Sequence, residues 1–248
     1  MNALGNIKTI AKRELSGYFS APVAYVFIVI FLLLTGFFTF MAGGFFERGQ
    51  ASLNGSFFMW HPWLYLFLVP AVGMRLWAEE RRVGTLELLL TMPITAWQAI
   101  VGKFLASWLF LALALALTFP VVITVNYLGS PDNGVIFAAY VGSFLLAGSY
   151  LAISCMTSAM TRNQVVSFIV SVVICLFLVL CGFAPVINLL DRLDKPWLVS
   201  LVASFSVMTH FESFGKGVLD SRDVIFFLSL IGFSLFTTGV ILRSHRAG

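Results

Sequence analysis

Residues 22–43 read PVAYVFIVIFLLLTGFFTFMAG and contain no charged side chain. About 20 apolar residues suffice to cross ~30 Å of hydrocarbon at the rise of an α-helix. The run therefore predicts a membrane-spanning helix. A basic segment precedes it and small residues lie at its end, as in a secretory signal, but the apolar core of a signal is only about 7 to 15 residues long. We expect an uncleaved span.

Five further apolar runs of similar length follow. They cover residues 57–77, 104–127, 135–157, 165–187 and 224–242. Pro62 and Pro70 interrupt the first of these five, and we expect Pro70 to kink the helix. The sequence predicts an all-α integral membrane bundle of six transmembrane helices, with residues 1–248 forming a single domain.

Composition supports lipid as the main solvent. Hydrophobic residues make up 60% of the chain and charged residues 10%, against roughly 25% charged residues in soluble domains. The mean hydropathy of +0.97 leaves too little polar material for a water-exposed surface. The fifteen Lys and Arg residues are scattered, which argues against nucleic acid as a partner. Cys155, Cys175 and Cys181 lie within apolar runs, so we expect free buried thiols.

Residues 1–20 are predicted to form an amphipathic helix on the membrane surface. Its apolar residues recur at helical spacing, opposite a charged face. The apolar residues are Ile7, Ile10, Ala11, Leu15, Tyr18 and Phe19, and the charged ones are Lys8, Lys12, Arg13 and Glu14. Pro22 should begin the first span after a break. A surface anchor with no further role explains this pattern equally well.

Lys and Arg near the spans set the orientation. With the N-terminus inside, the inner segments carry ten of these residues and the outer segments five. Four of those five lie in one long connection, residues 188–223. Both termini are therefore expected in the cytoplasm.

Residues 75–95 read RLWAEERRVGTLELLLTMPIT and lie between the second and third spans. Glu79 with Arg82, and Glu80 with Arg81, can form local charge pairs. Gly84 should end one helix, and Thr85 should cap a second. That second helix has an apolar face of Leu86, Leu89 and Leu90 beside Glu87, and Pro93 should end it.

A short amphipathic helix held at the cytoplasmic surface by two spans has two interpretations. It can dock into a groove of another protein and pass that protein's motion into the bundle. It can also simply lie among lipid headgroups. The physical pattern alone favours neither.

The motif Glu-Glu-Arg-Arg-x-Gly-Thr-Leu-Glu-Leu-Leu-Leu-Thr-x-Pro, residues 79–93, resembles the signature of ABC-2 type permeases. The resemblance extends to the N-terminal amphipathic helix, the six spans and the long outer connection. It implies that residues 78–97 form a cytoplasmic coupling segment that contacts a separate ATP-binding subunit. The coupling residues it implies are Glu79, Glu80, Arg81, Arg82, Gly84, Thr85, Leu86, Glu87, Leu89, Leu90 and Pro93.

The same resemblance implies the rest of the assembly. Two permease subunits, from this chain or a homologous one, would work with two ATP-binding subunits in the bacterial inner membrane. ATP and Mg would lie on the partner, and no cofactor on this chain. The membrane-spanning bundle would also contact lipids, and an accessory envelope protein is a further candidate partner.

The outer segment, residues 188–223, is expected to form short helices that cap the pathway. The apolar stretch from Trp197 onward is too short to span a membrane. The part before the last span is similar to permeases of the gliding-motility and nitrous-oxide-reductase-maturation types. Its polar residues are His210, Glu212, Lys216, Asp220, Arg222 and Asp223. His210 and Glu212 alone are too few ligands for a metal site.

Other classes fit less well. A phosphate-binding loop ends in Gly-Lys-Ser or Gly-Lys-Thr, but here Gly102-Lys103 precedes Phe104, so this chain is expected not to be an ATPase. An intramembrane hydrolase needs a base or metal beside its nucleophile, and the spans supply serines without one. Small residues at 142–154 are better explained by close helix packing.

Two alternatives stay open. The chain can export a substrate, or it can transmit mechanical force to envelope partners without transport. Charge-free span centres favour an amphipathic or lipid-linked cargo, or a pathway that opens only between subunits.

Overall fold

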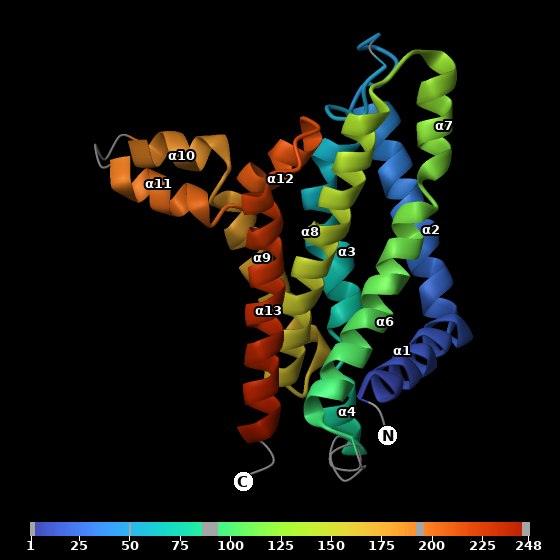
Figure 1. Ribbon diagram of the computed structural model, residues 1–248, viewed down its shortest axis with the longest axis vertical. Coiled ribbons are helices and arrows are strands. Elements are labelled where there is room, and N and C mark those ends of the chain that lie inside the picture. Colours follow the sequence, from blue (N-terminus) through green and yellow to red (C-terminus); the bar gives the residue numbers. More distant parts are fainter. Residues whose placement is uncertain (1–2, 50, 86–93, 192–195, 245–248) are drawn as a thin grey trace.

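The computed structural model describes residues 3–49, 51–85, 94–191 and 196–244, which fold into helices joined by loops (Figure 1). The first half contains α1 (Ala3–Ser20), α2 (Pro22–Phe37) with a π-helical turn (Phe38–Ala42), a 3-10 turn (Phe58–Trp60), α3 (His61–Gly73), α4 (Ala78–Val83), α6 (Ala96–Ala116) and α7 (Phe119–Leu128). The second half contains α8 (Asn133–Met160), α9 (Gln164–Leu180), α10 (Ala184–Asp191), α11 (Pro196–Ser204), α12 (Val207–Gly215) and α13 (Ser221–Ser244).

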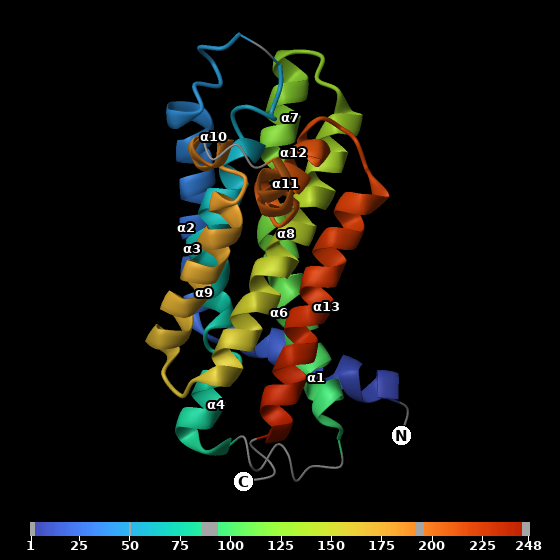
Figure 2. The same cartoon turned by 90° about the vertical axis from the view of Figure 1, so that its left-hand side faces the viewer.

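Helix α8 is the centre of the bundle. It packs against α3, α6, α9, α12 and α13, which surround it in both views (Figures 1 and 2). Its small residues allow these close approaches, because a Cβ atom at Gly142 would lie 2.7 Å from Phe214, and one at Gly148 would lie 2.7 Å from the Trp108 ring. The packing role predicted for this stretch is confirmed.

Four helical stretches in the described part are long and apolar enough to cross a membrane. They are Pro22–Ala42, Ala96–Leu128, Asn133–Met160 and Ser221–Ser244. They coincide with four of the six expected spans and support a multi-pass membrane protein. The three cysteines are free and buried, as expected.

The other two expected spans are shorter than the apolar runs suggested. In residues 57–77 the α-helix begins at His61, with Pro62 in its first turn, and ends at Gly73, so α3 has 13 residues. Helix α9 has 17 residues, and the chain turns at Cys181 and Gly182 before α10. At 1.5 Å per residue these helices reach roughly 20 and 26 Å. Six spans therefore remain a proposal.

The third expected span, residues 104–127, begins earlier and is divided. Thr95 accepts a hydrogen bond from the Gln98 backbone, and the Gln98 side chain accepts one from the Thr95 backbone, so a capping box begins α6 at Ala96. Pro120, in the first turn of α7, follows the break at Leu117 and Thr118.

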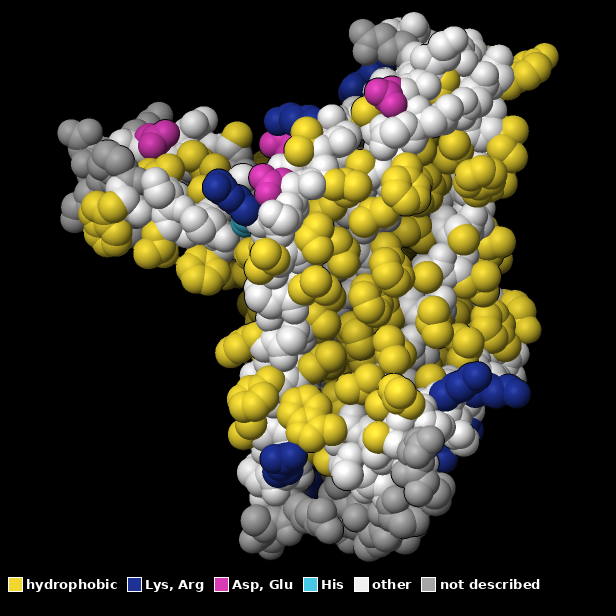
Figure 3. All heavy atoms as spheres, in the orientation of Figure 1, with side chains coloured by type: hydrophobic (Ala, Val, Ile, Leu, Met, Phe, Trp, Pro, Cys, Tyr) yellow, Lys and Arg dark blue, Asp and Glu magenta, His cyan; other side chains and the backbone are white. Residues whose placement is uncertain are grey.

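The surface shows the pattern that a bilayer requires. Hydrophobic side chains cover the middle of the bundle, while charged side chains gather towards its two ends (Figure 3). Exposed apolar residues such as Val29, Leu33 and Val173 are each more than half exposed. Lipid accounts for them better than water does.

Helix α1 lies across the lower part of α6 (Figure 1). The Tyr18 hydroxyl lies 2.8 Å from the Ser107 hydroxyl, and the Tyr18 ring stacks on Phe110. At Gly102 the helices approach so closely that a Cβ atom would lie 2.7 Å from Cγ2 of Ile10. The helix predicted for the surface is therefore also packed against the bundle.

Substituting Gly102→Val should displace α1 from α6. Overpacked interfaces cost about 1 to 3 kcal/mol, and here part of the obstacle is the Ile7 carbonyl oxygen, 3.3 Å from the added Cβ. We expect a lower midpoint of unfolding in detergent and weaker cysteine crosslinking between α1 and α6. Gly36→Val is the matched control, because a Cβ atom there meets nothing within 4 Å. Equal effects of the two substitutions would contradict the packing argument.

Helices α10 and α11 project sideways from the end of the bundle opposite α4 (Figure 1). Together with α12 they are three short helices between residues 184 and 215, so the first of them begins just before the predicted outer segment, residues 188–223. Their location outside the membrane remains a prediction.

Candidate functional site

The site is built around α4, which lies at the same end of the bundle as the start of α1 and the end of α13 (Figure 1). Helix α4 begins directly after Trp77 and ends at Gly84. Gly84 has a φ of 80°, a left-handed conformation that favours glycine, and its N–H donates to the Glu80 carbonyl. The helix break predicted at Gly84 is confirmed.

Ser158 of α8 fixes the start of α4. Its hydroxyl oxygen accepts hydrogen bonds from the backbone N–H groups of Trp77, at 3.0 Å, and Ala78, at 2.9 Å. Its hydroxyl donates to the Met74 carbonyl oxygen at 2.9 Å. A helix start has N–H groups without intrahelical partners, and Ser158 supplies one for two of them. Because α8 is the centre of the bundle, α4 is fixed to the core rather than to a loop.

Arg81 adds a second attachment to α8. Its guanidinium donates to the carbonyl oxygen of Ala159, near the end of α8. Burial lowers the pKa of Arg81 below its usual value, and the nearby charge of Arg162 lowers it further. A guanidinium nevertheless stays protonated at neutral pH.

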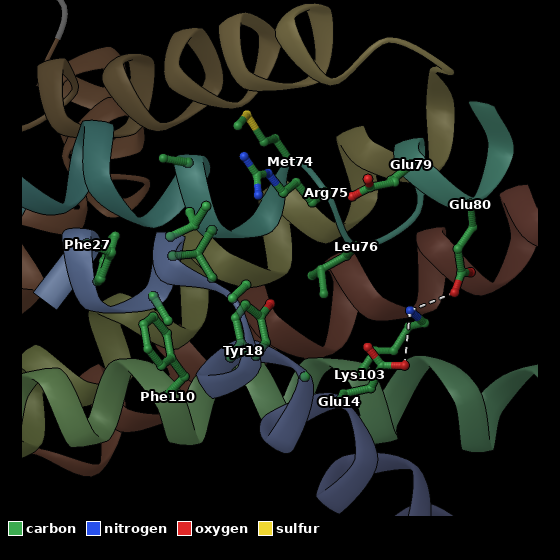
Figure 4. Close-up of a pocket in the computed structure, with 16 residues that line it drawn as sticks. Glu14, Tyr18, Phe27, Met74, Arg75, Leu76, Glu79, Glu80, Lys103 and Phe110 are labelled. Carbon is green, nitrogen blue, oxygen red and sulfur yellow. Dashed lines mark ion pairs between the residues drawn. The ribbon is translucent and has the colours of Figure 1, made fainter. Parts of the chain in front are cut away.

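Lys103 joins three helices in one charge cluster (Figure 4). From α6, its ammonium lies 2.8 Å from the Glu80 carboxylate of α4 and 3.5 Å from the Glu14 carboxylate of α1. The same ammonium lies 5.4 Å from the centre of the Trp77 ring. Its side chain is only 6% exposed. Two carboxylates and an aromatic ring compensate for this burial.

Two predicted charge positions are corrected by this cluster. Glu80 pairs with Lys103 rather than Arg81, whose guanidinium donates instead to the Ala159 carbonyl oxygen. Glu14 does not belong to a solvated face opposite the apolar one, because it faces Lys103 and also lies 2.9 Å from Arg13.

The remaining residues of the predicted coupling set are at the surface or outside the described part. Glu79 and Arg82 lie 3.9 Å apart, as predicted, and their side chains are 49% and 63% exposed. Thr85 is exposed. The other predicted residues, Leu86, Glu87, Leu89, Leu90 and Pro93, lie outside the described residues.

The polar residues of the outer segment belong to α12, the start of α13 and the connection between them, which lie towards the end of the molecule opposite α4 (Figure 1). His210 of α12 lies 2.6 Å from the Asp223 carboxylate of α13 and stacks on Phe226. Glu212 instead pairs with Lys216, 3.6 Å away, and Asp220 accepts from the backbone N–H of Arg222. His210 and Glu212 therefore have different partners and do not converge.

Sequence reasoning missed three residues of the α4 site. Glu14 and Lys103 were interpreted as surface and topology charges, and Ser158 as one of the span serines that lack a catalytic base. Lys103 carried a signal, because it lies two turns inside the helix that Thr95 begins. No sequence pattern distinguished Ser158 from the other serines.

Substituting Ser158→Ala should destabilise the protein by about 2 kcal/mol, because buried backbone groups would lose their partners. Its hydroxyl forms hydrogen bonds with three backbone groups at the start of α4, namely the N–H groups of Trp77 and Ala78 and the carbonyl of Met74. Ser154→Ala is the control, since the Ser154 hydroxyl donates only to Tyr150 within its own helix. The free energy of unfolding in mixed micelles measures both, and a loss at Ser158 no larger than at Ser154 would refute this role.

The apolar helical bundle, with four helices long enough to cross a bilayer, indicates a multi-pass membrane protein. A family model described as "ABC-2 family transporter protein" matches residues 64–196, which is more than half of the 248 residues. The chain belongs to this family, so the resemblance is confirmed at the family level. No curated protein matches the chain.

Membership makes the chain the membrane component of an ABC transporter, a component that is not itself catalytic and that works with an ATP-binding subunit. The matched residues extend from α3 to the first residue of α11 and include α4 and Lys103. The charge cluster described above therefore lies largely within the family domain.

Proposed function

We propose that this chain couples ATP hydrolysis on a separate subunit to export across the bacterial inner membrane, with residues 78–97 as the coupling segment. The observation that carries the proposal is the attachment of α4 to three helices. Ser158 and Arg81 attach it to α8, while Glu80 attaches it through Lys103 to α6 and α1. A force applied to α4 would therefore reach the core of the bundle directly.

The proposed assembly has two permease subunits and two ATP-binding subunits, with ATP and Mg on the latter. Each permease would have six spans, including the shorter α3 and α9, and both termini in the cytoplasm. The start of α1 and the end of α13 lie at one end of the bundle, which supports this topology (Figure 1). The subtype closest to gliding-motility and nitrous-oxide-reductase-maturation permeases is part of the proposal, and so is the role of α10–α12 as an outer cap.

The test uses the full chain co-expressed with its ATP-binding subunit. Cysteines at Thr85 or Thr91 should crosslink to that subunit, and the purified complex should hydrolyse ATP faster than the subunit alone. The mass of the complex in detergent gives its composition. A failure to crosslink from both positions, with unchanged hydrolysis, would overturn the coupling assignment.

Force transmission to an accessory envelope protein is the second candidate function. The observation that favours it is the pair α10 and α11, which projects from the bundle and exposes Leu189, Trp197 and Leu201. ATP-dependent accumulation of an amphipathic or lipid-linked substrate in vesicles that contain the purified complex would favour export. ATP hydrolysis without substrate movement would favour force transmission.

A further inference from the structure

A cavity of about 440 Å³ opens beside the charge cluster, between α1, α2, α6 and the end of α3 (Figure 4). Its volume is in the range of small-ligand sites. One part is apolar and is lined by Ala24, Phe27, Val72 and Phe110. The other part is lined by charged residues, Glu14, Arg75, Glu79, Glu80 and Lys103. The cavity is therefore amphipathic along its length.

The charges at the polar part are balanced except for one. Glu14 lies near Arg13 and Lys103, Glu80 pairs with Lys103, and Glu79 pairs with Arg82. Arg75 forms no ion pair or hydrogen bond with any residue that the structure describes. Counted with their ion-pair partners Arg13 and Arg82, which do not line the cavity, the three carboxylates accompany four cations, and the cation without a partner in the described part of the chain is Arg75, whose side chain is exposed. In Figure 4 the Arg75 guanidinium extends away from Glu79.

One end of the cavity is charged and the other is apolar, in the same order as the headgroup and acyl chain of a lipid. It lies where α1 meets α2, at the start of a candidate span. Phe27 is inside that span. Glu14 lies on α1, before the span, and Glu79 lies on α4, after α3. A lipid of the same leaflet would place its headgroup beside the charges and its acyl chain beside Phe27.

We propose that this cavity binds an anionic phospholipid, with its phosphate on Arg75 and one acyl chain along Phe27, Val72 and Phe110. A guanidinium forms charge-assisted, bidentate hydrogen bonds with phosphate oxygens. A zwitterionic headgroup would bring a second cation to a site that already has one in surplus. Charge complementarity therefore selects an anionic headgroup, and the apolar part selects a lipid over a free phosphate.

The test uses the full chain, delipidated in detergent and equilibrated with equal amounts of phosphatidylglycerol and phosphatidylcholine of identical acyl chains. Native mass spectrometry reports the lipid retained. We expect the unsubstituted protein to prefer phosphatidylglycerol about tenfold, because the choline cation of phosphatidylcholine offsets part of the attraction between its phosphate and Arg75. Arg75→Gln should reduce the preference to less than about twofold. Arg75→Lys should keep most of it, because the charge remains.

Arg162→Gln is the matched control, since it removes an exposed arginine in the connection between α8 and α9 that does not line the cavity. It should leave the preference unchanged. An unchanged preference in Arg75→Gln, or an equal loss in Arg162→Gln, would overturn the site. Glycerol 1-phosphate should not displace the lipid, and displacement at equal concentration would show a phosphate site instead. The ATP-binding subunit is absent, so the outcome is independent of the coupling proposal.

Discussion

Substituting Lys103→Met is expected to lower the free energy of unfolding by about 3 kcal/mol or more, because it leaves two partly buried carboxylates without their shared cation. The Glu80 and Glu14 side chains are 20% and 24% exposed, so water can replace only part of the lost interaction. The loss should detach α4 and α1 from α6 together. Unfolding in mixed micelles measures the stability, and cysteine crosslinks from α6 to each helix measure the detachment.

A compensated variant separates charge from packing. Lys103→Met combined with Glu14→Gln and Glu80→Gln removes the cation and both carboxylates, so only the exposed Arg13 loses a partner. Its stability should recover most of the loss, since an apolar or neutral replacement of a buried ion pair is often close to neutral. If the triple variant were as unstable as Lys103→Met alone, the cost would come from packing against Trp77 rather than from the charges.

Patterns that depend on local residues were predictable from the sequence. The apolar runs predicted the four long candidate spans, Gly84 predicted the end of α4, and Pro22 predicted the start of α2. Each of these features is determined within a few residues, by hydropathy, by a left-handed turn or by proline at a first helical turn. The predicted Glu79 and Arg82 pair belongs to the same group.

Features that depend on distant residues were not predictable. Lys103 lies 23 residues from Glu80 and 89 from Glu14, and only the packing of α1 and α4 on α6 joins them. The same limit applies to Ser158 and Met74, which are 84 residues apart. Helix ends also differed at α3 and α9, because apolar content continues beyond the point where the backbone turns.

Charge reversal at Glu79 or Glu87 is expected to weaken association with the ATP-binding subunit at least tenfold. Desolvated charges at an interface cost about 2 to 5 kcal/mol when their partners are left unpaired. Glu79 is half exposed, and its pair with Arg82 is too long and too exposed to contribute more than about 0.2 to 1 kcal/mol to the chain itself. Stability and membrane insertion should therefore stay unchanged. For Glu87, which lies outside the described residues, the expectation rests on the sequence motif.

Glu80 must be excluded from this test, although the same motif contains it. Its carboxylate already holds Lys103, so Glu80→Lys would place two cations together and destabilise the chain whether or not a partner binds. Glu79→Arg with Arg82→Glu is more informative, because it keeps a local pair while exchanging the charges that a partner would meet. The exchange leaves the net charge unchanged, and Arg162→Glu, a charge reversal outside α4, controls for the position of the charge. If affinity, measured by titrating the labelled ATP-binding subunit, fell equally in Arg162→Glu, the effect would not be specific to α4. If it fell in neither, α4 would not contact that subunit.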